Sequence, residues 1–177
     1  KTHELIQLMR EVMHAVAPEV IIITETNVPH GENVSYFGGG DDEAQMVYNF
    51  ALPPLLAFSI LKSDTTKLTH WAKELTLPGS GVCFFNFTAS HDGVGVRAVN
   101  EILDENEMNF LVQSTVEHGG LVSYRAIGDE EVSPYELNCS YLDLLTNPEE
   151  DDNTRVKRMI LSQAVVLVMP GVPGIYF

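Results

Sequence analysis

The chain has 177 residues, of which 45% are hydrophobic, and this is enough for one folded domain with a sizeable core. Its 25 acidic and 10 basic residues give a formal net charge of −15, which disfavours a nucleic-acid surface and leaves any anionic ligand dependent on a few local donors. The composition therefore excludes a disordered chain, and we expect no nucleic-acid partner.

Cysteine usage and the apolar runs give further expectations. Cys83 and Cys139 have no Cys-x-x-Cys spacing, and the histidines share no ligand spacing, so we expect no metal and no cofactor, in a reducing cytoplasm. The apolar run 164–169 stops at Pro170 and is too short to span a bilayer, and the N-terminus lacks a signal-peptide pattern. We expect no membrane partner.

Helical and strand patterns alternate in the first half of the chain. Apolar residues at helical spacing predict a helix from Leu5 that ends before Pro18. The β-branched run 20–25 does not alternate, which predicts a parallel strand buried on both faces. The glycine-rich segment 27–42 fits neither pattern and predicts a long loop, an insertion over about residues 27–45. A strand at 46–50 and helices at 53–61 and 65–75 follow.

The second half continues the alternation. An apolar run predicts a third buried strand at 81–88, and it leads directly into Ser-His-Asp-Gly at 90–93. A helix at about 100–117, a glycine-bearing segment around 119–128, a helix at 155–168 and a strand at 172–177 complete the chain, and the acidic run 149–152 is a solvated lead-in to the last helix. Four nonalternating strands separated by helices predict an α/β fold with a parallel sheet.

Two carboxylates follow predicted strands. In a (β/α)8 TIM barrel the chemistry lies on the loops after the carboxyl ends of the strands, and Glu25 and Asp92 both fall there. Burial at a strand end raises the pKa of a carboxyl group, which suits Glu25 to general-acid catalysis. The alternative is a structural acid that pairs with a basic neighbour or caps a loop, and position alone leaves both interpretations open.

His91 and Asp92 are adjacent on a glycine-permitted turn. An imidazole donor beside a carboxylate suits a grip on sugar hydroxyls that strengthens as the sugar becomes oxocarbenium-like. His-Asp-Gly is also a common structural turn. Two such sites at two strand ends favour the functional interpretation.

Five segments together carry a resemblance to a known family. They are Ile-Thr-Glu-Thr-Asn-Val-Pro-His at 23–30, Val-Tyr-Asn-Phe-Ala-Leu-Pro-Pro-Leu at 47–55, Ser-His-Asp-Gly-Val-Gly-Val-Arg at 90–97, Tyr-Glu-Leu-Asn at 135–138 and Met-Pro-Gly-Val-Pro-Gly-Ile-Tyr-Phe at 169–177. In this order they resemble the sucrose phosphorylase branch of the α-amylase superfamily, nearest to its glucosylglycerate and sucrose 6-phosphate phosphorylases. The resemblance implies a partial catalytic barrel over 1–177, covering about strands five to eight.

The same resemblance implies roles. Glu25 matches the acid/base glutamate, Asp92 the transition-state-stabilising aspartate and His91 the histidine that assists it. The family's nucleophile is an aspartate in an Arg-x-Asp-Ala type motif, which these 177 residues lack, so it is expected upstream of Lys1. The implied reaction is transfer of a glucosyl unit from an α-glucoside to inorganic phosphate by double displacement, with retention of configuration.

Contacts to acceptor and phosphate are expected after the acid/base and in the loop after the third strand. Asn27, Tyr135, Glu136 and Asn138 are the candidates that follow from the family motifs, and Asn27 and Glu136 depart from the residues typical of sucrose phosphorylases, which leaves the acceptor open. Two further candidates keep structural alternatives: Arg125 as a surface ion pair, and His30 as a hydrogen-bonding group within its own loop.

Alternatives remain for the activity as a whole. An α-glucan hydrolase or glucosyltransferase of the same superfamily would use the same carboxylates. A noncatalytic half-barrel is the expectation for the chain alone, and its strand edges and apolar helix faces predict a homo-oligomer.

Overall fold

Four short parallel strands form the main sheet, in the order β1-β2-β3-β7, in a computed structural model that describes residues 1–127 and 131–176. The strands are β1 (Ile23–Thr24), β2 (Met46–Tyr48), β3 (Cys83–Asn86) and β7 (Val172–Pro173). Ile23 pairs with Met46, Val47 with Phe84, and Phe85 with Val172. The four predicted strands and their parallel arrangement are therefore confirmed.

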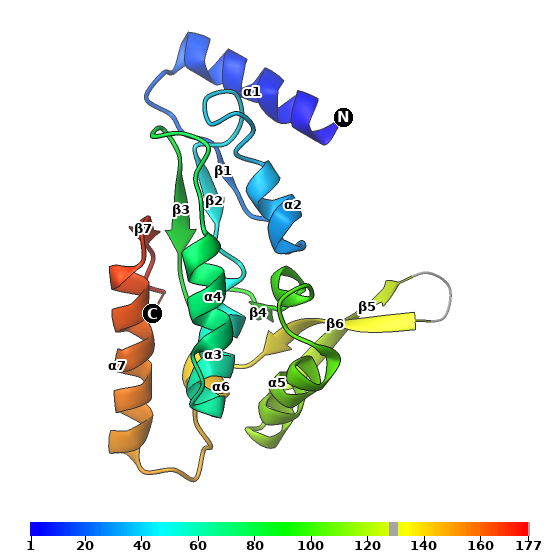
Figure 1. The fold of residues 1–177 in the computed structure, drawn as a ribbon, viewed down its shortest axis with the longest axis vertical. Coiled ribbons are helices and arrows are strands. Elements are labelled where there is room, and N and C mark those ends of the chain that lie inside the picture. The colour runs from blue at the N-terminus through cyan, green and yellow to red at the C-terminus, as the bar shows by residue number, and fades with distance from the viewer. Residues whose placement is uncertain (128–130, 177) are drawn as a thin grey trace.

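Helices connect the strands and cover the sheet (Figure 1). They are α1 (Thr2–Val16), α2 (His30–Ser35), α3 (Leu52–Lys62), α4 (Thr66–Glu74), α5 (Glu105–Glu117), α6 (Tyr141–Leu145) and α7 (Asp152–Val168). The residues of α3 from Leu52 to Ser59 are all buried, so this helix is the centre of the larger of two hydrophobic clusters. The smaller cluster lies under α2 and includes Phe37, Val47 and Phe84.

The chain between β3 and β7 forms a second sheet, which the sequence did not predict. It is antiparallel, with the order β4-β6-β5, and consists of β4 (Val94–Gly95), β5 (Leu121–Ile127) and β6 (Glu131–Asn138). In Figure 1 this sheet lies below and to the right of β3. A short 3₁₀ helix, η1 (Arg97–Val99), follows β4. The strict alternation of strand and helix was therefore wrong in this region.

Segment 27–42 is not only loop, because it contains α2. The helix has six residues, too few for a clear apolar period, and tertiary hydrogen bonds hold it. Its buried Asn33 accepts a hydrogen bond from the Thr26 hydroxyl at 2.8 Å and donates one to the Tyr48 carbonyl, also at 2.8 Å. The predicted loop was wrong over these residues because long-range contacts determine their conformation.

The expected burial of strand 20–25 on both faces was wrong. Val20, Ile21 and Ile23 are exposed, and β1 is an edge strand with one neighbour, β2, in the described part of the chain. The β-branched run correctly predicted a strand, but within the described residues this strand lies at the edge of the sheet and is partly exposed.

Helix ends follow local capping rules. Asp104 caps α5 by accepting a hydrogen bond from the Glu107 backbone N–H, and the Glu107 side chain accepts one from the Asp104 N–H. This capping box sets the start of α5 at Glu105, five residues later than predicted. Asp151 caps α7 in the same region as the acidic run that the sequence analysis interpreted as a helix lead-in.

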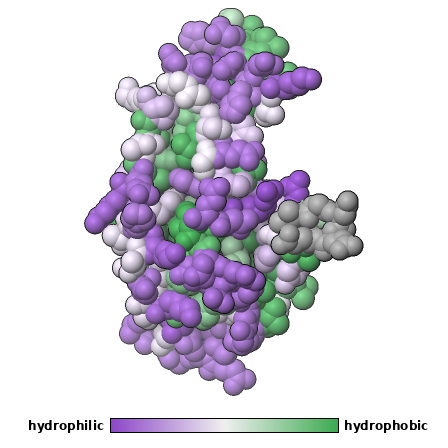
Figure 2. Space-filling view, turned by 45° about the vertical axis from the view of Figure 1, so that its right-hand side comes forward, coloured by the Kyte–Doolittle hydropathy of each residue, from purple (hydrophilic) through white to green (hydrophobic). Residues whose placement is uncertain are grey.

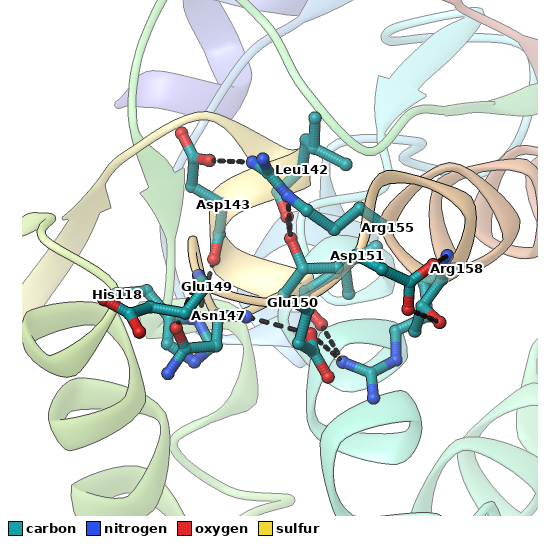
Figure 3. Close-up of polar contacts among 12 residues, drawn as sticks. His118, Leu142, Asp143, Asn147, Glu149, Glu150, Asp151, Arg155 and Arg158 are labelled. Carbon is teal, nitrogen blue, oxygen red and sulfur yellow. Dashed lines mark hydrogen bonds and ion pairs between the residues drawn. The ribbon is translucent and has the colours of Figure 1, made fainter.

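Ion pairs fasten α7 to α6 and to the segment between them (Figure 3). Arg155 binds Asp143 at 2.9 Å, and Arg158 binds Glu150 at 2.8 Å and donates to the Leu145 carbonyl. The ring of His118 donates to the Asp143 carbonyl at 2.7 Å. Both arginines of α7 are therefore occupied by acidic partners.

Helix α1 contacts the molecule through polar side chains and through Ile6, which packs against the smaller cluster. His3 and Gln7 bind the buried carboxylate of Glu43 at 2.7 and 3.1 Å. The apolar face predicted for this helix is exposed instead, with side chains between 51% and 73% accessible at Leu5, Leu8, Met9, Val12 and Val16. Figure 2 shows apolar surface at this end of the molecule. An exposed apolar helix face of this kind marks an interaction surface.

Candidate active site at the strand ends

Glu25 and Asp92 line the same hollow, although 66 residues separate them in the sequence. Glu25 directly follows β1, and Asp92 lies in the connection from β3 to β4. The hollow has a volume of about 170 Å³. It is lined by Glu25, Asn27, Phe50, His91, Asp92, Gly93, Tyr135 and Glu136. Six of the nine site residues predicted from the sequence are therefore brought together.

Glu25 is exposed in this chain, so the expected desolvation of its carboxylate was wrong. The reason is the position of β1 at the edge of the sheet, where no described element covers its outer side. The Glu25 carboxylate acts on Tyr48 of the neighbouring strand β2. Burial raises the pKa of Tyr48, and the charge of Glu25 raises it further.

His91, Asp92 and Glu136 form the polar part of the hollow. The His91 Nε2 atom lies 3.5 Å from Asp92 Oδ2, and both side chains are exposed. Ser90 shapes their turn, because its hydroxyl oxygen accepts a hydrogen bond from the Asp92 backbone N–H at 3.1 Å. The pKa of Glu136 is raised, first by burial and second by the charge of Asp92. The imidazole and the carboxylates thus offer donors and acceptors to a sugar.

Asn27 holds three parts of the site together. Its side chain donates to the Tyr135 carbonyl at 3.1 Å and accepts from the Arg97 backbone N–H at 3.3 Å. Gly95 allows this approach, because a Cβ atom at Gly95 would lie 2.7 Å from the Asn27 amide carbon. The Asn27 amide thus makes two hydrogen bonds that stabilise the site, and the residue also lines the hollow.

Asn138 does not line the hollow. Its amide donates to the Ser123 hydroxyl at 2.8 Å, which joins β6 to β5. Its side-chain oxygen lies against Gly93, where a Cβ atom would be 2.6 Å away. The structure places Asn138 behind the Asp92 turn, where it positions that turn.

His30 is also outside the hollow. Its ring packs against Trp71 and Phe84, with ring centroids 5.8 and 6.5 Å apart, and its Nδ1 atom is buried without a hydrogen-bond partner. Burial lowers the pKa of His30, and the charge of Glu101 acts weakly in the opposite direction. Two roles were predicted for His30, contact with an anionic acceptor and a hydrogen bond within its own loop. Among the described residues, Nδ1 makes no such hydrogen bond.

Arg125 lies on β5 and lines a separate hollow with Arg97. Sequence reasoning missed Arg97, as well as Tyr48 and Phe50 near the first hollow. The Tyr-Asn-Phe sequence at the end of a buried strand was the signal for the two aromatic residues. Arg97 ends the 90–97 motif, but its place beside Arg125 depends on β5 and could not be read from the motif.

No three His, Cys, Asp or Glu side chains gather in a metal-binding arrangement within residues 1–127 and 131–176. In the same part of the chain, each helix is too short or too polar to cross a membrane.

Comparison with solved structures indicates the class of fold to which this chain belongs. No family model matches the chain. Its fold is similar to that of a crystal structure of sucrose 6F-phosphate phosphorylase from Thermoanaerobacter thermosaccharolyticum, with a TM-score of 0.76 and 19% identity. The match covers 98% of this chain and 32% of that structure. The α/β fold of this chain is thus shared with part of this phosphorylase.

Sequence comparison is more specific. The chain is 48% identical to the glucosylglycerate phosphorylase of Escherichia coli over 99% of its length, and 46% identical to that of Allomeiothermus silvanus over 98%. It is 27% identical to the sucrose phosphorylase of Agrobacterium vitis over 74%. The chain spans about a third of the curated relatives, 32% of the first two. It is a homologue of the glucosylglycerate and sucrose phosphorylases, as the five motifs predicted.

Proposed function

We propose that this chain is the C-terminal half of the (β/α)8 barrel of a retaining glycoside phosphorylase, containing strands five to eight. The observation that carries the proposal is the hollow that joins Glu25, Asp92 and His91 at the carboxyl ends of parallel strands. High identity to glucosylglycerate phosphorylases over nearly the whole chain supports it. In barrel enzymes the catalytic groups lie at this end of the strands.

Glu25 is the general acid and base in the proposed reaction. It protonates the oxygen of the departing acceptor, while an aspartate outside these 177 residues attacks the anomeric carbon and forms a glucosyl-enzyme. Inorganic phosphate then attacks the anomeric carbon and displaces the aspartate, while the Glu25 carboxylate accepts a proton from the phosphate and returns to its protonated form. Two displacements retain the α configuration.

Asp92 and His91 bind the ring hydroxyls of the glucosyl unit. Their adjacent carboxylate and imidazole offer an acceptor and a donor on one turn, and such contacts strengthen as positive charge develops on the sugar. Asn27, Tyr135 and Glu136 lie on the other side of the same hollow and are proposed to contact the acceptor. Substrate contact by His30 and Asn138 stays a prediction.

The substrates proposed are an α-glucoside and inorganic phosphate, with a glucosylglycerate-type donor favoured over sucrose or sucrose 6-phosphate. Identity to the glucosylglycerate phosphorylases is 46–48%, against 24–27% to the sucrose phosphorylases. Both cysteines are free thiols, which supports a reducing, cytoplasmic location.

Half a barrel cannot complete this reaction alone. We propose that the edge of β1 and the exposed apolar face of α1 pack against the other half in the full-length protein. The chain by itself is then inactive and associates through these surfaces.

The test is phosphorolysis by the full-length protein that carries this chain. With glucosylglycerate as donor, we expect phosphate-dependent release of α-glucose 1-phosphate. Release of free glucose at equal rates with and without phosphate would contradict the proposal and favour a hydrolase. Glu25→Gln should lower kcat by about 10²- to 10⁴-fold, most with poorly departing acceptors. Glu19→Gln, an exposed acid outside the hollow, is the matched control.

A further inference from the structure

Two arginines line a second hollow next to the candidate active site. The hollow has a volume of about 170 Å³ and is formed by Arg97, Arg125, Ala126, Ser133 and Pro134. Arg125 comes from β5, directly opposite Ser133 on β6, and Arg97 comes from η1. Two guanidinium groups around one small hollow are unusual in a chain with a net charge of −15.

Neither arginine has an acidic partner among the side chains that the structure describes, those of 1–126 and 132–176. The ion pairs found there involve other cations, and the two arginines of α7 are both paired, as Figure 3 shows. Two like charges that share a hollow repel each other, and an anion between them converts this repulsion into attraction. Guanidinium groups also bind carboxylate and phosphate groups through two parallel hydrogen bonds.

The arginine hollow adjoins the hollow of Glu25 and Asp92. Pro134 lines the first and Tyr135, the next residue, lines the second. Asn27 joins them, since it lines the active-site hollow and binds both the Arg97 N–H and the Tyr135 carbonyl. Residues that line the two hollows are therefore direct neighbours.

We propose that Arg97 and Arg125 form an oxyanion subsite for one of the two reactants that bond to the glucosyl unit in turn, the acceptor or inorganic phosphate. The shared chemistry is a small anionic group with two or more oxygens, which the carboxylate of an acid-bearing acceptor and inorganic phosphate both provide. This inference rests on the proposed function. It adds a specificity-determining role for Arg97, the last residue of the 90–97 motif, to which the sequence analysis assigned no role.

The kinetic test compares Arg97→Gln and Arg125→Gln with the parent in the full-length protein. In the synthetic direction, from α-glucose 1-phosphate, the KM for glycerate should rise about 10- to 100-fold, whereas the KM for glycerol, a neutral acceptor, stays unchanged. A rise in the KM for phosphate with an unchanged KM for glycerate would assign the subsite to phosphate. Unchanged values for both anions in both variants would overturn the inference. Lys157→Gln, which removes an exposed cation from α7, is the matched control.

Binding separates this inference from the proposed function. In isothermal titration calorimetry with inorganic phosphate and with glycerate, the parent should bind at least one of them, and Arg97→Gln should weaken that binding by the same factor as the KM changes. If the parent shows no phosphorolysis but binds an oxyanion through Arg97, the proposed function fails and the subsite stands. If phosphorolysis occurs and Arg97→Gln binds both anions as the parent does, the subsite fails alone. Circular dichroism of each variant verifies that the fold is intact.

Discussion

The Asn27 side chain accepts a hydrogen bond from the Arg97 backbone N–H at 3.3 Å and so connects the segment after β1 to η1. The same side chain donates to Tyr135 on β6 at 3.1 Å. The residue two positions after Glu25 thereby fixes the segments that surround both hollows. Substitutions that move Asn27 should disturb the site without removing any carboxylate.

Gly95→Ala is the sharpest way to move Asn27. The added Cβ atom would lie 2.7 to 2.8 Å from three atoms of the Asn27 amide, so the side chain has to leave its two hydrogen bonds. We expect a loss of about 1 to 3 kcal/mol in the free energy of unfolding, measured by urea denaturation. Gly31→Ala is the control, because nothing lies within 4 Å of a Cβ atom there and α2 already has helical backbone, and it should be neutral or stabilising. Equal effects of the two variants would contradict this role of Gly95.

The sequence predicted the parallel strands and the two strand-end carboxylates because local information determines them. The apolar run 81–88 forms the interior strand β3, and the polar group after it emerges at the strand end. The capping signals at Asp104 and Asp151 are equally local, and applying them more strictly would have corrected the start of α5.

The second sheet, α2 and the outward face of α1 could not be predicted in this way. Leu121 to Ile127 becomes a strand by pairing with β6, and Asn33 stabilises α2 through residues 7 and 15 positions away. The apolar period of α1 correctly predicted a helix but not which side of it contacts the rest of the molecule. That side is determined by a long-range contact, since His3 and Gln7 bind the buried Glu43. Arg97 reaches its hollow through these long-range contacts.

Asn86→Ala should destabilise the junction of β2, β3 and the segment before β7. The buried Asn86 side chain accepts from Asn49 at 2.9 Å and donates to the Pro170 carbonyl at 3.0 Å. Its removal leaves the Asn49 amide and a carbonyl without partners, at a cost of about 2 to 4 kcal/mol, which thermal unfolding would report. The exposed Asn109→Ala on α5 is the control and should change the stability by less than about 0.5 kcal/mol. A smaller loss at Asn86 than at Asn109 would show that this hydrogen-bonded junction is dispensable.

Glu136→Gln should change how stability depends on pH. The folded-state pKa of Glu136 is raised by burial and by Asp92, so the folded state holds its proton more tightly than the unfolded state does. The parent chain therefore loses stability as the pH rises from the unfolded pKa of a glutamate through the raised folded value. The variant carries no such charge, so it should be more stable than the parent above this window and equal to it below.

Chemical denaturation over a series of pH values measures this difference. Glu149→Gln removes an exposed acid whose side chain makes no contact with Asp92, and its stability should follow the parent at every pH. A Glu136→Gln curve that stays parallel to that of the parent across the window would contradict the coupling of Glu136 to Asp92.

The apolar face of α1 should make the 177-residue chain associate with itself. Leu8 and Val12 are 59% and 51% exposed, one helical turn apart, whereas the polar side of the helix binds Glu43. Replacing both by Lys removes apolar surface from the association and adds repulsion between copies, so sedimentation velocity should show a shift toward monomer. Glu4→Gln with Glu11→Gln changes the charge of the same helix by the same amount and leaves the apolar residues in place, so it separates the loss of apolar contact from a general effect of charge. A parent chain that sediments as a strict monomer at high concentration would show that this face needs no partner.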